Sequence, residues 1–337
     1  MKRNLVTIFM FFSIFLMSAC QNLQSDVSNT NESVFLGDSN GYPVDAYPAI
    51  NENVKDVAQI PLGPPPKFPG KIAFQTNQLS GNLEVVILDG STGQLQELSQ
   101  GVTQATEPDW SPDCRELIFT VGTGSNMDFV LYRQLVDGGV AEPFLNHSDS
   151  YDWAAAWSPN GDVIAYQNNL GQGLNVCFVD PQGNELGCMS GTGVDNAMPA
   201  WSPDGSQLAF ASTRDGDWEL YVTNYPAMDT VTRLTNHGGS DFDPAWSPDG
   251  SAIVFSRKDG GDYDLFVVQP DGRNERQISD DGADERFPEW VGNDLIVYSA
   301  GFEDEMDLFL MNKDGSNSQP LTFAPGLDQW PAWCGTP

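Results

Sequence analysis

The chain has 337 residues, of which 40% are hydrophobic and 11% aromatic, so it has enough apolar material for a folded core. Asp and Glu number 47 against 15 Lys and Arg, which gives a formal net charge of −32. This charge excludes a nucleic-acid-binding function and disfavours anionic lipid surfaces. It favours cations or basic partners, although acidity can also serve solubility alone.

The first twenty residues have the pattern of an export signal. Lys2 and Arg3 precede an apolar run over residues 5–17, shorter than the ~20 residues of a membrane span. The run ends in LMSAC, which resembles the signal of bacterial lipoproteins, although Met17 stands where Leu, Val or Ile is usual. The resemblance implies a signal peptide at residues 1–19 and lipidation of Cys20. The alternative is an ordinary secreted protein that is cleaved nearby.

Residues 20–69 are predicted to be a tether between the lipidated Cys20 and a folded domain. This stretch is rich in Asn, Ser, Asp and Pro, and it ends in PLGPPPKFPG. Such a composition favours a flexible chain that becomes stiff and extended at its proline-rich end. We therefore expect the folded domain, residues 70–337, to stand off a membrane outside the cytoplasm.

A repeat built on tryptophan organises the rest of the chain. Its anchors are separated by 47, 44, 45, 44 and 43 residues, and they are Trp110, Trp157, Trp201, Trp246, Trp290 and Trp333. A period of this length is typical of one four-stranded propeller blade per repeat. In each unit a short strand ends at Trp, Ser-Pro-Asp-Gly forms a tight turn, and an apolar strand such as LAF or IVF follows.

The two ends of the repeat region complement each other. GKIAFQTN at Gly70 begins with the second strand of a blade, and PAWCGTP at the C-terminus is a Trp strand without the rest. Joined, they make one blade. We therefore predict an all-β, six-bladed propeller closed by pairing of the C-terminal strand with the N-terminal blade.

The units PAWSPDG, at 199–205 and 244–250, resemble the repeats of TolB-like six-bladed β-propellers. The resemblance covers about residues 70–337 and implies the propeller fold. TolB itself carries a folded α/β domain ahead of its propeller, whereas residues 21–69 resemble a tether. The propeller is therefore expected here without the role of TolB in the Tol system.

Export makes disulfides permissible, and two pairs are candidates. In LNVCFVDPQGNELGCMSG, a hairpin that turns at Gln182 and Gly183 places Cys177 opposite Cys188, within bonding reach. Cys114 and Cys334 follow Trp anchors of neighbouring blades, where a bond would lock the ring. Two buried free thiols are the alternative for Cys177 and Cys188.

The loops that lead into the Trp strands are expected to converge at the mouth of the central channel. Five residues before the anchors stand Ala105, Asp152, Asn196, Asp241, Glu285 and Asp328, with Glu107 two places after Ala105. Apolar side chains stand beside them: Trp153, Met198, Phe242, Phe287 and Trp330. A crown of carboxylates with aromatic anchors suits a basic partner. The alternative is structural, because Asp and Asn often cap their own loops.

The predicted function is a monomeric, noncatalytic binding module of the bacterial cell envelope that captures a protein or peptide, especially a basic one. No Gly-x-Ser-x-Gly motif is present, and His147 and His237 are the only histidines. A calcium-dependent lactonase or esterase is one alternative, with carboxylates and Asn196 holding the ion. A carbohydrate-binding propeller is another, suggested by Trp153, Trp218 and Trp330.

Overall fold

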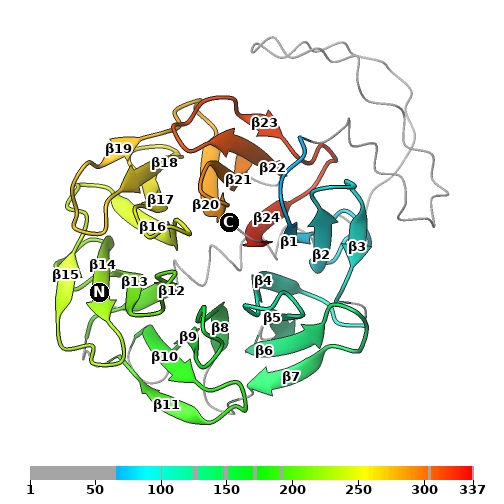
Figure 1. Cartoon of the computed structure of the whole chain (residues 1–337), viewed down its shortest axis with the longest axis horizontal. Helices are drawn as coiled ribbons and strands as arrows, with labels where there is room; N and C mark the ends of the chain where they lie inside the picture. The colour runs from blue at the N-terminus through cyan, green and yellow to red at the C-terminus, as the bar shows by residue number, and fades with distance from the viewer. Residues whose placement is uncertain are drawn as a thin grey trace, which may run out of the picture. The chain divides into compact units, whose positions relative to one another are not determined.

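The computed structural model describes residues 66–99, 101–123, 128–145, 147, 151–169, 173–189, 193–302 and 305–335. The expected signal peptide, Cys20 and most of the tether lie outside these residues. The described part forms six antiparallel sheets of four strands each, arranged around a central axis (Figure 1). The prediction of an all-β, six-bladed propeller is confirmed.

Blade 1 combines the two ends of the described chain and contains β24 (Asp328–Cys334), β1 (Lys71–Thr76), β2 (Glu84–Asp89) and β3 (Leu95–Glu97). The strands of blade 2 are β4 (Ala105–Trp110), β5 (Glu116–Thr123), β6 (Asp128–Leu135) and β7 (Glu142–Leu145). Blade 3 consists of β8 (Asp152–Trp157), β9 (Ile164–Asn168), β10 (Asn175–Val179) and β11 (Glu185–Cys188).

Blade 4 contains β12 (Asn196–Trp201), β13 (Gln207–Ser212), β14 (Glu219–Asn224) and β15 (Val231–Arg233). Blade 5 contains β16 (Ser240–Trp246), β17 (Ile253–Lys258), β18 (Tyr263–Val268) and β19 (Arg276–Gln277). Blade 6 contains β20 (Asp284–Val291), β21 (Leu295–Phe302), β22 (Glu305–Asn312) and β23 (Gln319–Pro320). In Figure 1 the strands that contain the Trp anchors lie nearest the centre; they are β4, β8, β12, β16, β20 and β24.

The hydrophobic core lies between neighbouring blades. The second strand of each blade is buried on both faces, which explains its continuous apolar sequence; β9, for example, is buried at every position. One cluster packs Ala165 and Phe178 of blade 3 against Phe210 and Tyr221 of blade 4. A propeller thus repeats the same sheet-on-sheet contact around the ring.

The Ser-Pro-Asp-Gly segment forms the turn that the repeat predicts. In blade 4, Gly205 N donates to Ser202 O at 2.8 Å, and Ser202 Oγ donates to Asp204 Oδ1 at 2.7 Å. Gly205 has a φ of 69°, a conformation that glycine adopts without steric cost. Blade 2 has Cys114 at this position with a φ of 59°, so its turn accepts backbone strain.

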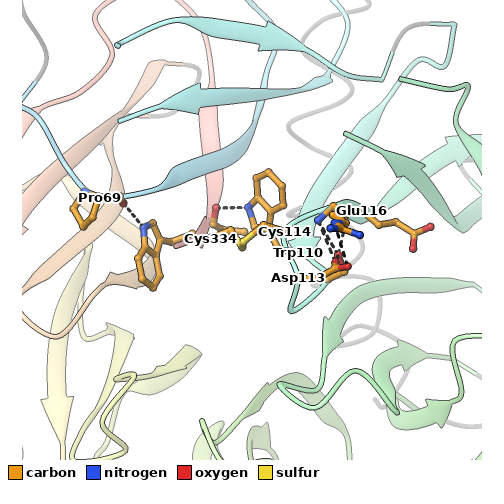
Figure 2. The surroundings of a disulfide bond; sticks show 10 residues. Pro69, Trp110, Asp113, Cys114, Glu116 and Cys334 are labelled. Carbon is orange, nitrogen blue, oxygen red and sulfur yellow. Dashed lines mark hydrogen bonds and ion pairs between the residues drawn. A yellow bond between two sulfur atoms is a disulfide. The ribbon is translucent and has the colours of Figure 1, made fainter. Parts of the chain in front are cut away.

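The ring closes where β24 pairs with β1, and a disulfide joins this blade to the next. Cys334, the last residue of β24, is bonded to Cys114 in the turn between β4 and β5, with a Cα–Cα distance of 5.9 Å (Figure 2). Beside the bond, Trp110 Nε1 donates to Ala332 O at 3.0 Å. Cys177 and Cys188 are also bonded, directly opposite each other in the register of β10 and β11. Both candidate pairs are thus disulfides in the structure.

Candidate functional site: the central channel

The polar residues that stand five positions before the Trp anchors are buried. Their side chains expose 1% of their surface or less, and they are Asp152, Asn196, Asp241, Glu285 and Asp328. They begin the inner strands, or follow the first residue, as the sequence predicts. They do not form an accessible crown at the channel mouth, so this expectation is corrected.

The physical reason is that most of these side chains find partners inside the propeller. Asp241 accepts two hydrogen bonds from Arg257, from Nε at 2.6 Å and from Nη2 at 2.8 Å. Asp328 Oδ2 accepts from Gln78 Nε2 at 2.9 Å. Because a buried charge is tolerated only with such partners, these groups stabilise the inner strands. The structural alternative therefore describes them better than binding does.

Asp152 and the amide oxygen of Asn196 also have partners inside the propeller, whereas the buried Nδ2 of Asn196 has none. Asp152 accepts from Asn168 Nδ2 and is 2.7 Å from His147 Nδ1, whose other nitrogen is 2.9 Å from Glu185 Oε1. Asn196 Oδ1 accepts from Arg214 Nη2 at 2.9 Å. His147 thus links Asp152 to Glu185.

A bulge in every inner strand aims one side chain at the central axis. Three positions before each Trp anchor the register shifts and φ is positive, between 47° and 56°. Bulges reorient side chains in this way. The six bulge residues, one per blade, are Trp330, Glu107, Ala154, Met198, Asp243 and Phe287.

The bulge residues line a cavity of about 370 Å³ in the channel. Its wall also includes the residue before each anchor and the turn prolines Pro159, Pro203 and Pro248. The cavity thus occupies the half of the channel nearer the turns. Of the predicted binding residues, Glu107 and Trp330 line it, whereas the following do not: Asp152, Trp153, Asn196, Asp241, Phe242, Glu285 and Asp328.

Four carboxyl groups line this cavity: Glu107, Asp109, Asp243 and Glu289. Burial raises the pKa of Glu107 to about 7 and that of Asp109 to about 6. Burial also raises the pKa of Asp243, and burial together with the charge of Asp109 raises the pKa of Glu289 well above its usual range. The pKa values of Glu107 and Asp109 thus lie near neutral pH, which is a common property of functional sites.

Three of the four carboxyl groups also join strands or blades. Glu107 Oε2 accepts from Ala154 N of the next blade at 3.1 Å, and Asp109 Oδ2 accepts from Trp157 N at 2.6 Å. Asp243 Oδ2 accepts from Ser256 Oγ at 3.0 Å, while its buried Oδ1 has no hydrogen-bond partner. Each thus has a defined position in the wall.

The wall of the cavity is aromatic at blades 6 and 1. Phe287 and Trp330 stack with ring centroids 3.8 Å apart. By contrast, the rings of Trp153 and Phe129 have centroids 6.2 Å apart, and those of Phe242 and Trp218 are 5.8 Å apart. Trp153, Trp218 and Phe242 belong to packing contacts and not to the cavity wall.

Sequence reasoning missed Asp109, Asp243 and Glu289 as candidates. A signal for two of them stands in the repeat, because the residue before the anchor is Ala in four repeats and acidic only at Asp109 and Glu289. The signal for Asp243 is its position three residues before Trp246, shared with Glu107. In a regular strand, side chains alternate between the two faces of the sheet, so the sequence does not predict that this side chain points to the central axis.

Within the ranges that the structure describes, no three His, Cys, Asp or Glu side chains come together as a ready metal-binding group. Among the same residues, no helix has the length and hydrophobicity needed to cross a bilayer.

Comparison with known proteins agrees with this architecture. Residues 189–335 match the TolB beta propeller domain (PD40). Over 79 residues the chain is 30% identical to the Tol-Pal system protein TolB of Blochmanniella floridana, a match that covers 23% of this chain and 17% of that protein. Over 168 residues it is 26% identical to the TolB homolog of Chlorobium luteolum, covering 50% of this chain and 37% of the relative.

Among solved structures, TolB from Acinetobacter baumannii superposes with a TM-score of 0.66 at 20% sequence identity. The superposition covers 79% of this chain and 67% of that chain. The matches to the two relatives span less than half of their length. The resemblance to TolB-like propellers that the tryptophan repeat predicts is thereby confirmed.

Proposed function

We propose that this protein is a noncatalytic binding propeller of the bacterial cell envelope that holds a basic segment of a partner protein in its central channel. The observation that carries the proposal is that Glu107, Asp109, Asp243 and Glu289 line one cavity. A Lys or Arg side chain entering the cavity would compensate these charges, and Phe287 and Trp330 would contact its aliphatic stem.

The net charge and the relatives support the same function. A formal charge of −32 steers basic partners toward the protein at long range. One relative is the Tol-Pal system protein TolB, which supports an envelope location here. The role of the whole relative is not transferred, because the match covers only 17% of it.

The location outside the cytoplasm rests on the N-terminal sequence. We propose that residues 1–19 are a signal peptide, that Cys20 carries the lipid anchor, and that residues 20–69 tether a propeller of residues 70–337. The run before LMSAC and the proline-rich segment support this division. The propeller itself is proposed to act as a monomer, since pairing of β24 with β1 closes its ring.

A labelled hexalysine peptide tests the proposed channel site. Fluorescence anisotropy would compare the full chain with Glu107→Gln and Glu289→Gln, using Asp162→Asn as a control of equal charge on an exposed turn. We expect each channel variant to weaken binding about tenfold, because it removes one buried charge, and the control to leave affinity unchanged. Equal affinities for all four proteins would overturn the channel as the binding site.

A further inference from the structure

Glu285, where blade 6 meets blade 5, lacks the arginine that its equivalent in blade 5, Asp241, binds. Asp241 of β16 is opposite Arg257 of β17, which binds it with two hydrogen bonds. The equivalent residue of β20 is Glu285, and its opposite residue in β21 is Ala300. The two second strands otherwise match closely, IVFSR against IVYSA. Blade 6 thus keeps the carboxylate and has lost the arginine.

The carboxylate left at this junction has an unsatisfied oxygen. Glu285 is 1% exposed, and its Oε2 has no hydrogen-bond partner. Asp264 of β18, on the neighbouring blade, also has a buried oxygen, Oδ1, without a partner. A buried carboxyl oxygen without a partner is costly, so two at one junction call for a ligand or a proton.

Other carboxylates surround these two. Burial raises the pKa of Glu285 to about 8, assisted by the charges of Asp281, Asp264 and Asp280. Burial raises the pKa of Asp264 to about 6, with further contributions from Asp262 and Asp280. A positive ion between Glu285 and Asp264 would lower the pKa of both acids and would take the place that Arg257 has beside Asp241.

We propose that Glu285 and Asp264 are the fixed ligands of a divalent cation, of the calcium class, bound between blades 5 and 6. A hard cation suits a site made only of oxygen atoms, and calcium accepts carboxylates together with water. Within the described ranges no third acidic side chain joins these two as a ready metal-binding group. Water or the exposed Asp280 and Asp281 would therefore complete the coordination of the ion. An ion fits better than a partner's side chain because Glu285 is almost wholly enclosed.

This site is separate from the channel. Neither Glu285 nor Asp264 lines the channel cavity. A variant of Glu107 therefore serves as a control that removes a channel carboxylate and leaves the junction intact. Failure of the cation site would leave the proposed capture of a basic segment untouched, and the reverse also holds.

Calorimetric titration of the full chain with CaCl₂ tests the proposal. We expect one binding event with a Kd of about 10⁻⁴ to 10⁻³ M, as in extracellular calcium modules, and at least a tenfold weaker one in Glu285→Gln and in Asp264→Asn. Glu107→Gln and the exposed Asp271→Asn are expected to bind calcium like the natural protein. No calcium binding by the natural protein, or equal binding by the Glu285 and Asp264 variants, would overturn the proposal.

The variant Ala300→Arg rebuilds the arrangement of blade 5 inside blade 6. Its guanidinium would replace the ion, so we expect calcium binding to disappear while the unfolding temperature in EDTA equals or exceeds that of the natural protein. If this variant fails to fold, the unfolding temperature of Glu285→Gln with and without calcium tests the site instead. With a bound ion, calcium raises the unfolding temperature of the natural protein and not that of Glu285→Gln. An equal rise in both proteins contradicts the site.

Discussion

Cys114 of blade 2 and Cys334 of blade 1, the blade in which the ring closes, are bonded over a sequence separation of 220 residues. A cross-link that closes so long a loop restricts the unfolded chain strongly. We predict that Cys114→Gly with Cys334→Ser lowers the free energy of unfolding by about 5 kcal/mol in non-reducing urea titrations. Glycine is the matched choice, because it removes the strain of the positive φ at Cys114 together with the bond.

The hairpin disulfide gives the comparison for this prediction. Cys177 and Cys188 close a loop with a sequence separation of 11, so their replacement by Ser should cost less, about 3 kcal/mol in the same loop-entropy estimate. A larger loss from the hairpin pair than from the closing pair would contradict the view that the ring closure needs the covalent bond.

The buried pair of Asp241 and Arg257 leads to a second prediction. Arg257 is 2% exposed, so Asp241→Asn leaves a guanidinium with one interaction fewer in a closed environment. We expect the free energy of unfolding to fall by about 3–5 kcal/mol in urea titrations. The equivalent change Glu285→Gln, measured in EDTA, should not destabilise the protein, because no arginine is opposite it. Equal losses in the two variants would show that the position and not the partner determines stability.

The repeat sequence predicts the architecture because propeller blades repeat a local pattern. Trp anchors, Ser-Pro-Asp-Gly turns and apolar second strands each indicate a local structure, and the incomplete units at Gly70 and Trp333 indicate how the ends join. Each of these predictions depends only on residues that are close in the sequence, within one blade, or on the two ends of the chain. The fold could therefore be predicted in full.

The candidate site could be predicted only in part, because it depends on where side chains point. The bulge at residues such as Glu107 and Asp243 reverses the direction that simple alternation assigns. Likewise, Asp241 resembles an exposed loop acid until its register with Arg257 is known. Such pairings link strands through tertiary structure, and their partners vary from blade to blade.

The indole groups of the anchors supply a third prediction. Trp290 Nε1 donates to Ala245 O of the preceding blade at 3.2 Å, whereas the buried Nε1 of Trp246 has no partner. Substitution by Phe removes similar apolar area in both cases, since the two residues are 3% and 8% exposed. We expect Trp290→Phe to destabilise more than Trp246→Phe, by about 1–3 kcal/mol in urea titrations. Equal losses would mean that the hydrogen bond between blades contributes nothing.

The channel carboxyl groups predict how stability depends on pH. The pKa of Glu107 rises from 4.5 to about 7 on folding, so the folded protein binds a proton that the unfolded chain has released between these pH values. Its contribution to stability is therefore fully present below about pH 4.5 and is lost as the pH rises to about 7. Glu107→Gln should flatten this part of the stability curve, measured by urea titration from pH 5 to pH 8.

A basic ligand should reverse this trend. If a Lys side chain enters the channel, its charge favours ionised Glu107 and Asp109, and binding releases protons. The affinity for hexalysine should therefore increase from pH 6 to pH 8, although the peptide itself keeps its charge over this range. Asp162→Asn should retain the increase, and Glu107→Gln should reduce it. An affinity independent of pH in the natural protein would place the peptide outside the carboxyl-lined cavity, because the pKa values of Glu107, about 7, and Asp109, about 6, lie in this interval.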